Sequence, residues 1–125
     1  MANILVIDDD EALRGLLLAM LKATGHTAIA FTNGLDGLKH FRTAPADLVI
    51  TDMVMPYSGL ATIRIIRKEF PDVGIIAMTG GGDFRLDYAV GTGAHATLRK
   101  PFLVEELTAA IAEAMAARTS AKPKP

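Results

Sequence analysis

Short apolar segments alternate with longer amphipathic segments along the whole chain. Five segments are rich in Val, Ile, Leu and Ala, which is typical of strands buried on both faces: residues 3–7, 27–31, 47–51, 73–78 and 96–99. Between and after them, apolar residues recur with the spacing of one helical face. This stripe comprises Leu13, Leu16, Leu17, Met20 and Leu21 in the first predicted helix, and Leu35, Leu38 and Phe41 in the second. The pattern predicts five strands that alternate with five helices.

Capping and breaking residues locate the ends of these helices. Asp9 or Asp10 is positioned to cap the first helix, Asn33 the second and Ser58 the third, and Asp83 opens the fourth. Pro71 stops the third helix, and Gly91 or Gly93 closes the fourth. The last helix is predicted from about Leu103 to Ala117, and no Ser, Thr, Asp or Asn stands before it as a cap.

Strict alternation of apolar strands and helices predicts an α/β fold. A parallel sheet of five strands would be covered by helices on both faces, giving a three-layer, doubly wound (βα)5 domain. Right-handed crossovers limit the strand order to a few possibilities. We expect residues 1–117 to form one domain. Residues 118–125 contain two prolines and no periodicity, and we expect a disordered polar tail there.

Composition narrows the class of protein further. The 125 residues include no cysteine, which excludes a disulfide framework, a thiolate zinc site and a cysteine nucleophile. The net charge of −1 gives no reason to expect nucleic-acid or membrane binding. The first residues, MANILVID, lack the pattern of a signal peptide, and no apolar run is long enough to span a bilayer. We expect a cytoplasmic domain.

Polar residues gather where the predicted strands end. Asp8 and Asp9 follow the first strand, Asp52 the third, Thr79 the fourth and Lys100 the fifth. In a parallel α/β sheet these ends share one edge, where ligands bind. Two carboxylates about 4 Å apart repel by about 4 kcal/mol at an effective dielectric near 20, so converging aspartates need a cation. Carboxylate oxygens suit Mg²⁺.

The same residues suggest a chemistry for this edge. Lys100 offers a positive charge for an anion, and Thr79 offers a hydroxyl donor. A cation, a lysine and a hydroxyl around one carboxylate form a pocket for a phosphoryl group on Asp52. Carboxylates act as phosphoryl acceptors in other proteins and form an aspartyl phosphate.

Together these motifs resemble the receiver domain of two-component response regulators. The matching pieces are the pair Asp8–Asp9 after an apolar strand, Asp52 followed by MVMP, Thr79 followed by glycine, and KPF at residues 100–102. The resemblance extends from Asn3 to about Ala117 and implies the flavodoxin-like strand order 2-1-3-4-5.

The resemblance also implies a role for each residue of the site. Asp52 would be the phosphoacceptor, while Thr79 and Lys100 would contact the phosphoryl oxygens. Asp9 would bind Mg²⁺ directly, Asp8 through water, and Val54 through its backbone carbonyl; Asp52 completes the metal site. The Lys100–Pro101 peptide bond is expected to be cis.

Partners follow from the resemblance as well. The phosphodonor would be a histidine kinase, a phosphotransfer protein or a small molecule such as acetyl phosphate. A downstream protein would read the face formed by the fourth helix, the fifth strand and the fifth helix. We expect a stand-alone switch that is a monomer or a weak dimer linked to phosphorylation, with no enzymatic activity beyond its own phosphorylation and dephosphorylation.

Some positions depart from the common receiver pattern. Thr97 stands where many receivers carry Tyr or Phe, so a large aromatic rotation cannot couple Thr79 to the partner face. Ser58 replaces a common Asp. Val54 and Gly81, two residues past Asp52 and Thr79, give an attacking water no side-chain partner, and we expect this to affect the lifetime of the phosphoryl group.

Two alternatives stay open at this point. The letters Asp8-Asp9-Asp10 also satisfy the D-x-D pattern of Mg²⁺-dependent phosphatases that form an aspartyl phosphate, although the chain has little room for a substrate-specificity element. A binding scaffold that no longer depends on phosphate is the second alternative. Turnover that depends on Asp8 would favour the first, and partner binding unaltered by D52N the second.

Overall fold

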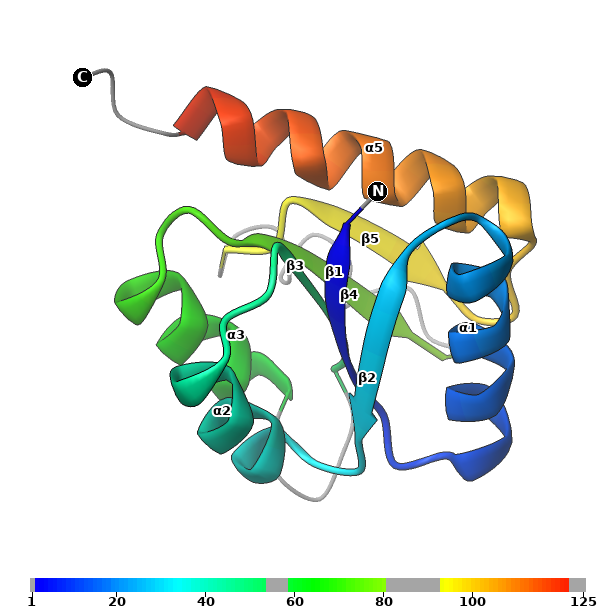
Figure 1. Cartoon of the computed structure of the whole chain (residues 1–125), viewed down its shortest axis with the longest axis horizontal. Coiled ribbons are helices and arrows are strands. Elements are labelled where there is room, and N and C mark those ends of the chain that lie inside the picture. The colour runs from blue at the N-terminus through cyan, green and yellow to red at the C-terminus, as the bar shows by residue number, and fades with distance from the viewer. Residues whose placement is uncertain (1, 54–58, 81–92, 122–125) are drawn as a thin grey trace.

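A five-stranded parallel sheet forms the centre of the structure, a computed structural model that describes residues 2–53, 59–80 and 93–121 (Figure 1). The strands are β1 (Asn3–Ile7), β2 (Thr27–Phe31), β3 (Leu48–Asp52), β4 (Gly74–Thr79) and β5 (Ala96–Arg99). The helices in the described part are α1 (Glu11–Ala23), α2 (Gly34–Thr43), α3 (Gly59–Glu69) and α5 (Val104–Ala121). The strand order β2-β1-β3-β4-β5 confirms the predicted doubly wound fold.

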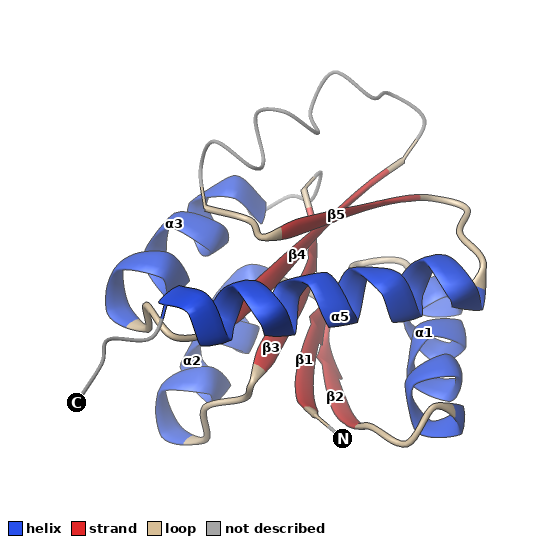
Figure 2. Cartoon of the chain, turned by 90° about the horizontal axis from the view of Figure 1, so that it is seen from above, coloured by secondary structure: helices blue, strands red, loops and turns tan. Residues whose placement is uncertain are grey.

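The helices cover the sheet in two layers. Helices α1 and α5 lie on one face, and α2 and α3 lie on the other (Figures 1 and 2). Successive residues of a strand point to opposite faces, so β1, β3 and β4 each contribute to two apolar clusters. One cluster joins Val6 and Ile50 to Leu17 of α1 and Ile111 of α5. The sheet therefore divides the core in two.

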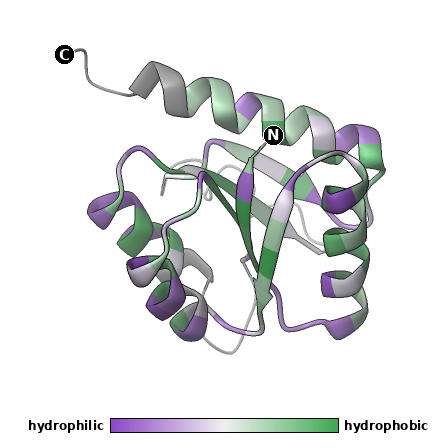
Figure 3. Ribbon diagram, viewed as in Figure 1, coloured by the Kyte–Doolittle hydropathy of each residue, from purple (hydrophilic) through white to green (hydrophobic). Residues whose placement is uncertain are grey.

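The second cluster lies against α2 and α3. It contains Leu5 and Val49 from the strands, Phe41 from α2 and Ile63 from α3. All residues of β3 and β4 are buried, as their apolar runs predicted. Hydrophobic residues follow the central strands, whereas hydrophilic residues gather on the outer helix surfaces and loops (Figure 3).

Two leucines that the sequence assigned to buried helical stripes are instead exposed. Leu16 of α1 is 52% exposed and Leu35 of α2 is 56% exposed. Leu16 precedes the buried Leu17 by one residue, which is about 100° around the helix, and so it points away from the core. The prediction was wrong because both leucines lie just beyond the face that each helix packs on the sheet.

Side chains cap the helices α1 and α2 as predicted. The Asp10 carboxylate accepts a hydrogen bond from the Leu13 backbone N–H at 3.2 Å, which decides between Asp9 and Asp10. The Asn33 side chain accepts one from the Asp36 N–H at 2.8 Å. Each bond satisfies a donor that the first helical turn leaves without an intrahelical partner.

Helix α5 begins at Val104, close to its predicted start, but its cap and its C-terminal end differ from the prediction. At the start, the Glu106 carboxylate accepts a hydrogen bond from the Leu103 N–H at 2.7 Å. This is half of a capping box, and it replaces the missing Ser, Thr, Asp or Asn. At the end, the helix continues to Ala121, so residues 118–121 are helical and not a disordered tail. No proline or glycine precedes Pro123 there to stop the helix.

Several sequence predictions lie outside the described residues. These are the turn at Pro56, the Ser58 cap, the Val54 carbonyl, Gly81 and the fourth helix from Asp83. The Lys100–Pro101 peptide bond is cis, as the family resemblance implied. Within the described ranges, no helix has both the length and the apolar character that crossing a membrane requires.

Candidate functional site

The register of the sheet brings the predicted site residues to one edge. Ile7 of β1 pairs with Thr51 of β3, so the next residues along these strands, Asp8 and Asp52, lie side by side. On the other side of β3, Asp52 pairs with Met78 of β4, the residue before Thr79. Thr79 pairs with Arg99 of β5, the residue before Lys100. Parallel pairing alone thus gathers side chains that are far apart in the sequence.

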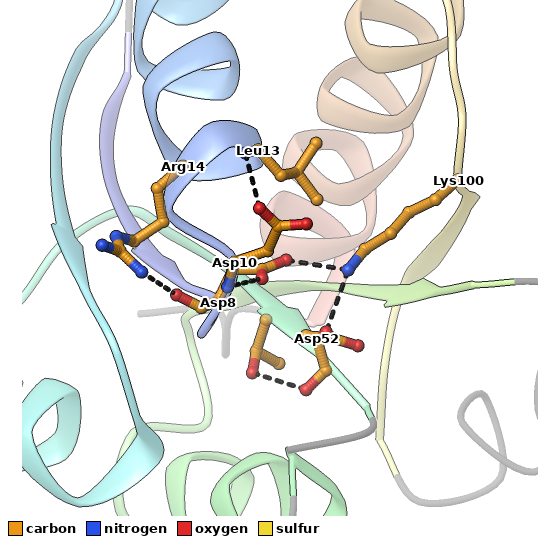
Figure 4. A network of polar contacts seen from close by, with 7 residues as sticks. Asp8, Asp10, Leu13, Arg14, Asp52 and Lys100 are labelled. Atoms are coloured by element: carbon orange, nitrogen blue, oxygen red, sulfur yellow. Dashed lines mark hydrogen bonds and ion pairs between the residues drawn. The ribbon is translucent and has the colours of Figure 1, made fainter.

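Lys100 joins the two buried aspartates (Figure 4). Its Nζ lies 2.9 Å from Asp8 Oδ2 and 2.9 Å from Asp52 Oδ2. Both carboxylates are buried, and the side chain of Lys100 is 19% exposed. The ammonium therefore supplies a counter-ion to carboxylates that would otherwise repel each other in a poorly hydrated site.

These contacts keep Lys100 charged. Burial by itself lowers the pKa of the Lys100 ammonium, but the hydrogen bonds that it donates to Asp52 and Asp8 and the charges of both carboxylates outweigh this effect. The net result is a pKa of Lys100 raised above its usual 10.5. A permanent positive charge at this position can pair with an anionic group that arrives at Asp52.

Each polar atom of Asp8 has a partner. Its backbone N–H donates to the Phe31 carbonyl at 3.1 Å, and its carbonyl accepts from Arg14 Nη1 at 2.9 Å. The carboxylate oxygen Oδ1 accepts from the Asp10 N–H at 2.7 Å, and Oδ2 is the oxygen bound to Lys100. Asp8 is held in place by β2, α1 and Lys100 together.

Asp9 completes an acidic cluster beside these residues. One carboxylate oxygen from each of Asp8, Asp9 and Asp52 lies within 4.8 Å of the other two. Asp9 is exposed, whereas the other two are buried. Three carboxylates exceed the single charge of Lys100, and hard cations such as Mg²⁺ prefer oxygen donors of this kind. The donor set therefore fits the metal that the sequence predicted.

Thr79 contributes a hydroxyl at the end of β4. The residue is 1% exposed, and its Oγ1 has no hydrogen-bond partner among the described residues. A buried hydroxyl without a partner carries a desolvation cost of about 1–3 kcal/mol. Such a group is a donor available to a ligand.

The structure places all the described site residues of the prediction at this one edge: Asp8, Asp9, Asp52, Thr79 and Lys100. Val54 lies outside the described residues. Thr97 is partly buried in β5 and pairs with Ala77 of β4.

Arg14 was missed by the sequence reasoning. Its signal is a basic residue four positions after the helix cap Asp10, which places it in the second turn of α1.

Comparisons with known proteins show which sequences the chain resembles. The family model of the response regulator receiver domain matches residues 4–112. The chain is 34% identical over 114 residues to the DNA-binding transcriptional regulator NtrC of Escherichia coli (strain K12), covering 88% of this chain and 24% of that protein. The chain thus spans about a quarter of the length of this curated relative.

Solved structures give the same result. A receiver domain protein from Clostridium thermocellum has a TM-score of 0.87 at 34% identity, covering 96% of this chain and 98% of that one. NtrX from Brucella abortus in complex with ADP has a TM-score of 0.88 at 26% identity, covering 95% of this chain and 27% of that one. By its sequence, its fold and the residues at the edge of its sheet, the chain belongs to the response regulator receiver domain family.

Proposed function

We propose that this receiver domain is a phosphorylation-dependent switch that accepts a phosphoryl group on Asp52 with the help of Mg²⁺. The observation that carries the proposal is the Asp52 carboxylate, buried at the end of β3, with Lys100 Nζ at 2.9 Å and two further aspartates beside it. This arrangement combines a nucleophilic carboxylate with a fixed positive charge and a donor set for a divalent cation.

The chemistry is a phosphoryl transfer. An Asp52 oxygen attacks the phosphorus of the donor and forms a P–O bond. The bond between phosphorus and the donor's nitrogen or oxygen breaks, and its electron pair leaves with the donor. Attack of water on phosphorus later releases inorganic phosphate and restores the carboxylate. A histidine kinase or a phosphotransfer protein is the proposed donor in the cell.

The chain's own residues have distinct roles in this proposal. Lys100 exchanges its contact with the Asp52 carboxylate for one with a phosphoryl oxygen, which its raised pKa favours. The buried hydroxyl of Thr79 donates to another phosphoryl oxygen and thereby gains the partner that it lacks among the described residues. When bound, Mg²⁺ neutralises negative charge on the phosphoryl group.

The metal would be held by the acidic cluster. Asp9, which is exposed, and Asp52 would bind Mg²⁺ directly, with the carbonyl of Val54 as a further ligand. Both carboxylate oxygens of Asp8 already have partners, Lys100 and the Asp10 N–H, so Asp8 would act through a bound water. This division of roles agrees with the preference of Mg²⁺ for retaining several waters.

Phosphorylation would become a change of surface through Thr79. Movement of this residue toward the phosphoryl group would displace the chain that follows it and the neighbouring strand β5, which pairs with β4 at Thr79 and Arg99. A downstream protein would read the surface that includes β5 and α5. Because Thr97 cannot make an aromatic rotation, the change would be carried by backbone and packing shifts.

Intact-protein mass after incubation with acetyl phosphate and Mg²⁺ tests the proposal. We expect a gain of one phosphoryl group that is absent in D52N and absent when the metal is chelated. D47N is the matched control, because Asp47 lies at the start of β3, at the opposite edge of the sheet, where its carboxylate accepts from the Asn3 N–H. A gain retained in D52N, or no gain in the wild type with a histidine kinase as donor, would contradict the proposal.

The lifetime of the phosphoryl group forms a separate part of the proposal. Val54 and Gly81 offer no polar side chain to the water that attacks the aspartyl phosphate. Replacing both with polar residues should change the rate of dephosphorylation, measured by loss of the phosphorylated mass after the donor is removed. An unchanged rate would show that these positions do not control the lifetime.

A further inference from the structure

Asp8 is approached by a cation from each side. Lys100 Nζ contacts the carboxylate, and Arg14 Nη1 contacts the backbone carbonyl at 2.9 Å (Figure 4). The two side chains come from distant parts of the chain, the residue after β5 and helix α1, and lie on opposite sides of Asp8 in this view. Lys100 also contacts Asp52, whereas the described contact of Arg14 is with the backbone.

The contact of Arg14 orients the acidic residues through the backbone. Asp8, Asp9 and Asp10 form the connection between β1 and α1, and the carbonyl of Asp8 is part of the peptide group that leads into Asp9. Fixing that carbonyl fixes the orientation of the peptide plane, and hence the direction in which the chain enters Asp9. The Asp10 N–H then bonds back to Asp8 Oδ1 at 2.7 Å. Arg14, a residue of helix α1, thus restrains the turn of residues 8–10 through its hydrogen bond to the Asp8 carbonyl.

We propose that Arg14 is a positioning residue that aims Asp8 and Asp9 at Asp52 by holding the Asp8 carbonyl. It does so without touching the phosphoryl group or the metal. This inference rests on the proposed function, because it assigns Arg14 to the assembly of the same Mg²⁺ and phosphoryl site. Residues that orient metal ligands typically change metal affinity by about 10- to 100-fold when they are replaced.

The positive charge of Arg14 and its positioning role have opposite effects on Mg²⁺ affinity, so the two can be told apart. A cation beside an acidic cluster repels Mg²⁺, so loss of the charge alone would strengthen Mg²⁺ binding. Loss of positioning would weaken it. A purely structural role would lower the unfolding midpoint and leave the affinity of the folded protein unchanged.

The experiment compares R14M and R14K with the wild type, using the full chain. R14M removes the donor and the charge and keeps an apolar stem, whereas R14K keeps the charge with one donor group. The first readout is the Mg²⁺ dissociation constant, measured by calorimetric titration with MgCl₂. The titration is done at a temperature well below the midpoint of thermal unfolding of each variant. R42M is the matched control, because Arg42 forms an exposed ion pair with Glu69 between α2 and α3.

We expect R14M to bind Mg²⁺ about tenfold more weakly than the wild type. R14K should lie between the two proteins, because lysine partly restores the contact, and R42M should stay within twofold of the wild type. A dissociation constant of R14M equal to or lower than that of the wild type would overturn the inference. If R14M does not fold, R14K decides: weaker binding supports the inference, and wild-type affinity overturns it.

A second readout needs no metal. Hydrogen exchange of the Asp10 amide, which donates to Asp8 Oδ1, should be faster in R14M than in the wild type. Exchange of the Gly74 amide, which donates to the Asp47 carbonyl at the opposite edge of the sheet, should be unchanged. Equal exchange of the Asp10 amide in both proteins would also count against positioning. A wild type that neither binds Mg²⁺ nor takes up a phosphoryl group would overturn the proposed function itself.

Discussion

The guanidinium of Arg67 lies against the imidazole of His95. Its Nη2 is 2.9 Å from Nε2 and 3.2 Å from Nδ1 of the ring, and the same Nδ1 accepts the Ile75 N–H at 3.0 Å. Arg67 also donates to the carbonyls of Pro71 and Val73. The pair thus connects α3, the start of β4 and the residue before β5, at the edge of the sheet opposite the aspartates.

This contact predicts a pH dependence of stability. Burial, and then the charge of Arg67, lower the pKa of His95 below its usual 6.5. The unfolded chain therefore binds a proton more readily than the folded one as the pH falls below 6.5, so stability is fully present above that pH and declines toward the lowered pKa. Urea unfolding at intervals between pH 5 and pH 7.5 measures this decline.

Replacing the ring isolates its contribution. H95N retains an acceptor for the Ile75 N–H but does not titrate, so its stability should vary less with pH than that of the wild type. His26, whose pKa burial also lowers, adds a slope of the same sign in both proteins and cancels in the comparison. An identical pH dependence of H95N and the wild type would refute this explanation.

Removing Lys100 should destabilise the protein at neutral pH. K100M leaves two buried carboxylates without their counter-ion, and breaking a buried pair in this way costs about 3–5 kcal/mol. The deficit should shrink in K100M/D8N and in saturating Mg²⁺, because both reduce the repulsion. A loss of less than about 1 kcal/mol in urea unfolding would mean that the carboxylates are better solvated than their burial indicates.

The contribution of Lys100 to stability also has a defined pH window. Its pKa is raised on folding, so the contribution is fully present below the unfolded value of 10.5 and is lost as the pH rises through the raised value. In K100M this alkaline loss should be absent. An equally steep alkaline loss in K100M would assign the effect to other groups.

Substitution of Asp9 should weaken Mg²⁺ binding without changing the stability of the metal-free protein. Asp9 is the exposed member of the acidic cluster, so D9N should change the stability of the metal-free protein by no more than about 0.5 kcal/mol. In the wild type, Mg²⁺ at 100 times its dissociation constant should add about 2.7 kcal/mol to the free energy of unfolding. D9N should lose most of this gain. An equal gain in D9N would exclude Asp9 as a ligand.

Two helical glycines should respond to alanine in opposite ways. Gly15 lies in α1 with nothing near its missing Cβ, so G15A should stabilise the protein by about 0.5–1 kcal/mol through helix propensity. A Cβ on Gly34 would collide with the Thr62 hydroxyl of α3, and G34A should cost about 1–3 kcal/mol. Thermal unfolding of both variants checks the signs, and G34A/T62A should recover part of the loss.

The fold followed from the sequence because β1, β3 and β4 each contain a run of buried apolar residues, and amphipathic helices separate successive strands. Strand β2 has no buried residue, but its apolar segment still indicated a strand. The predicted strands 3–7, 27–31 and 96–99 have the bounds of β1, β2 and β5. Strands β3 and β4 lie one residue further along than predicted, because pairing continues through Asp52 and Thr79. A polar residue at a strand end reads as the start of a loop, although its backbone still pairs.

The positions of the site residues could be predicted for the same reason, since parallel strands end at one edge. Their contacts could not. That Lys100 bridges Asp8 and Asp52 depends on side-chain reach across two strands, and the contact of Arg14 with a carbonyl depends on the turn before α1. The half capping box of Glu106 does have a sequence signal, a glutamate three residues after Leu103, although no Ser, Thr, Asp or Asn stands at the cap position.

Because the sheet divides the core, substitutions in one helical layer should affect stability independently of substitutions in the other layer. Leu17 and Ile111 belong to one apolar cluster, and Phe41 and Ile63 to the other, with only strand residues between them. Substitutions in clusters without shared contacts have additive effects on the free energy of unfolding. Either layer can therefore be repacked, and its outer surface adapted to a new partner, while the opposite layer keeps the strand ends in register.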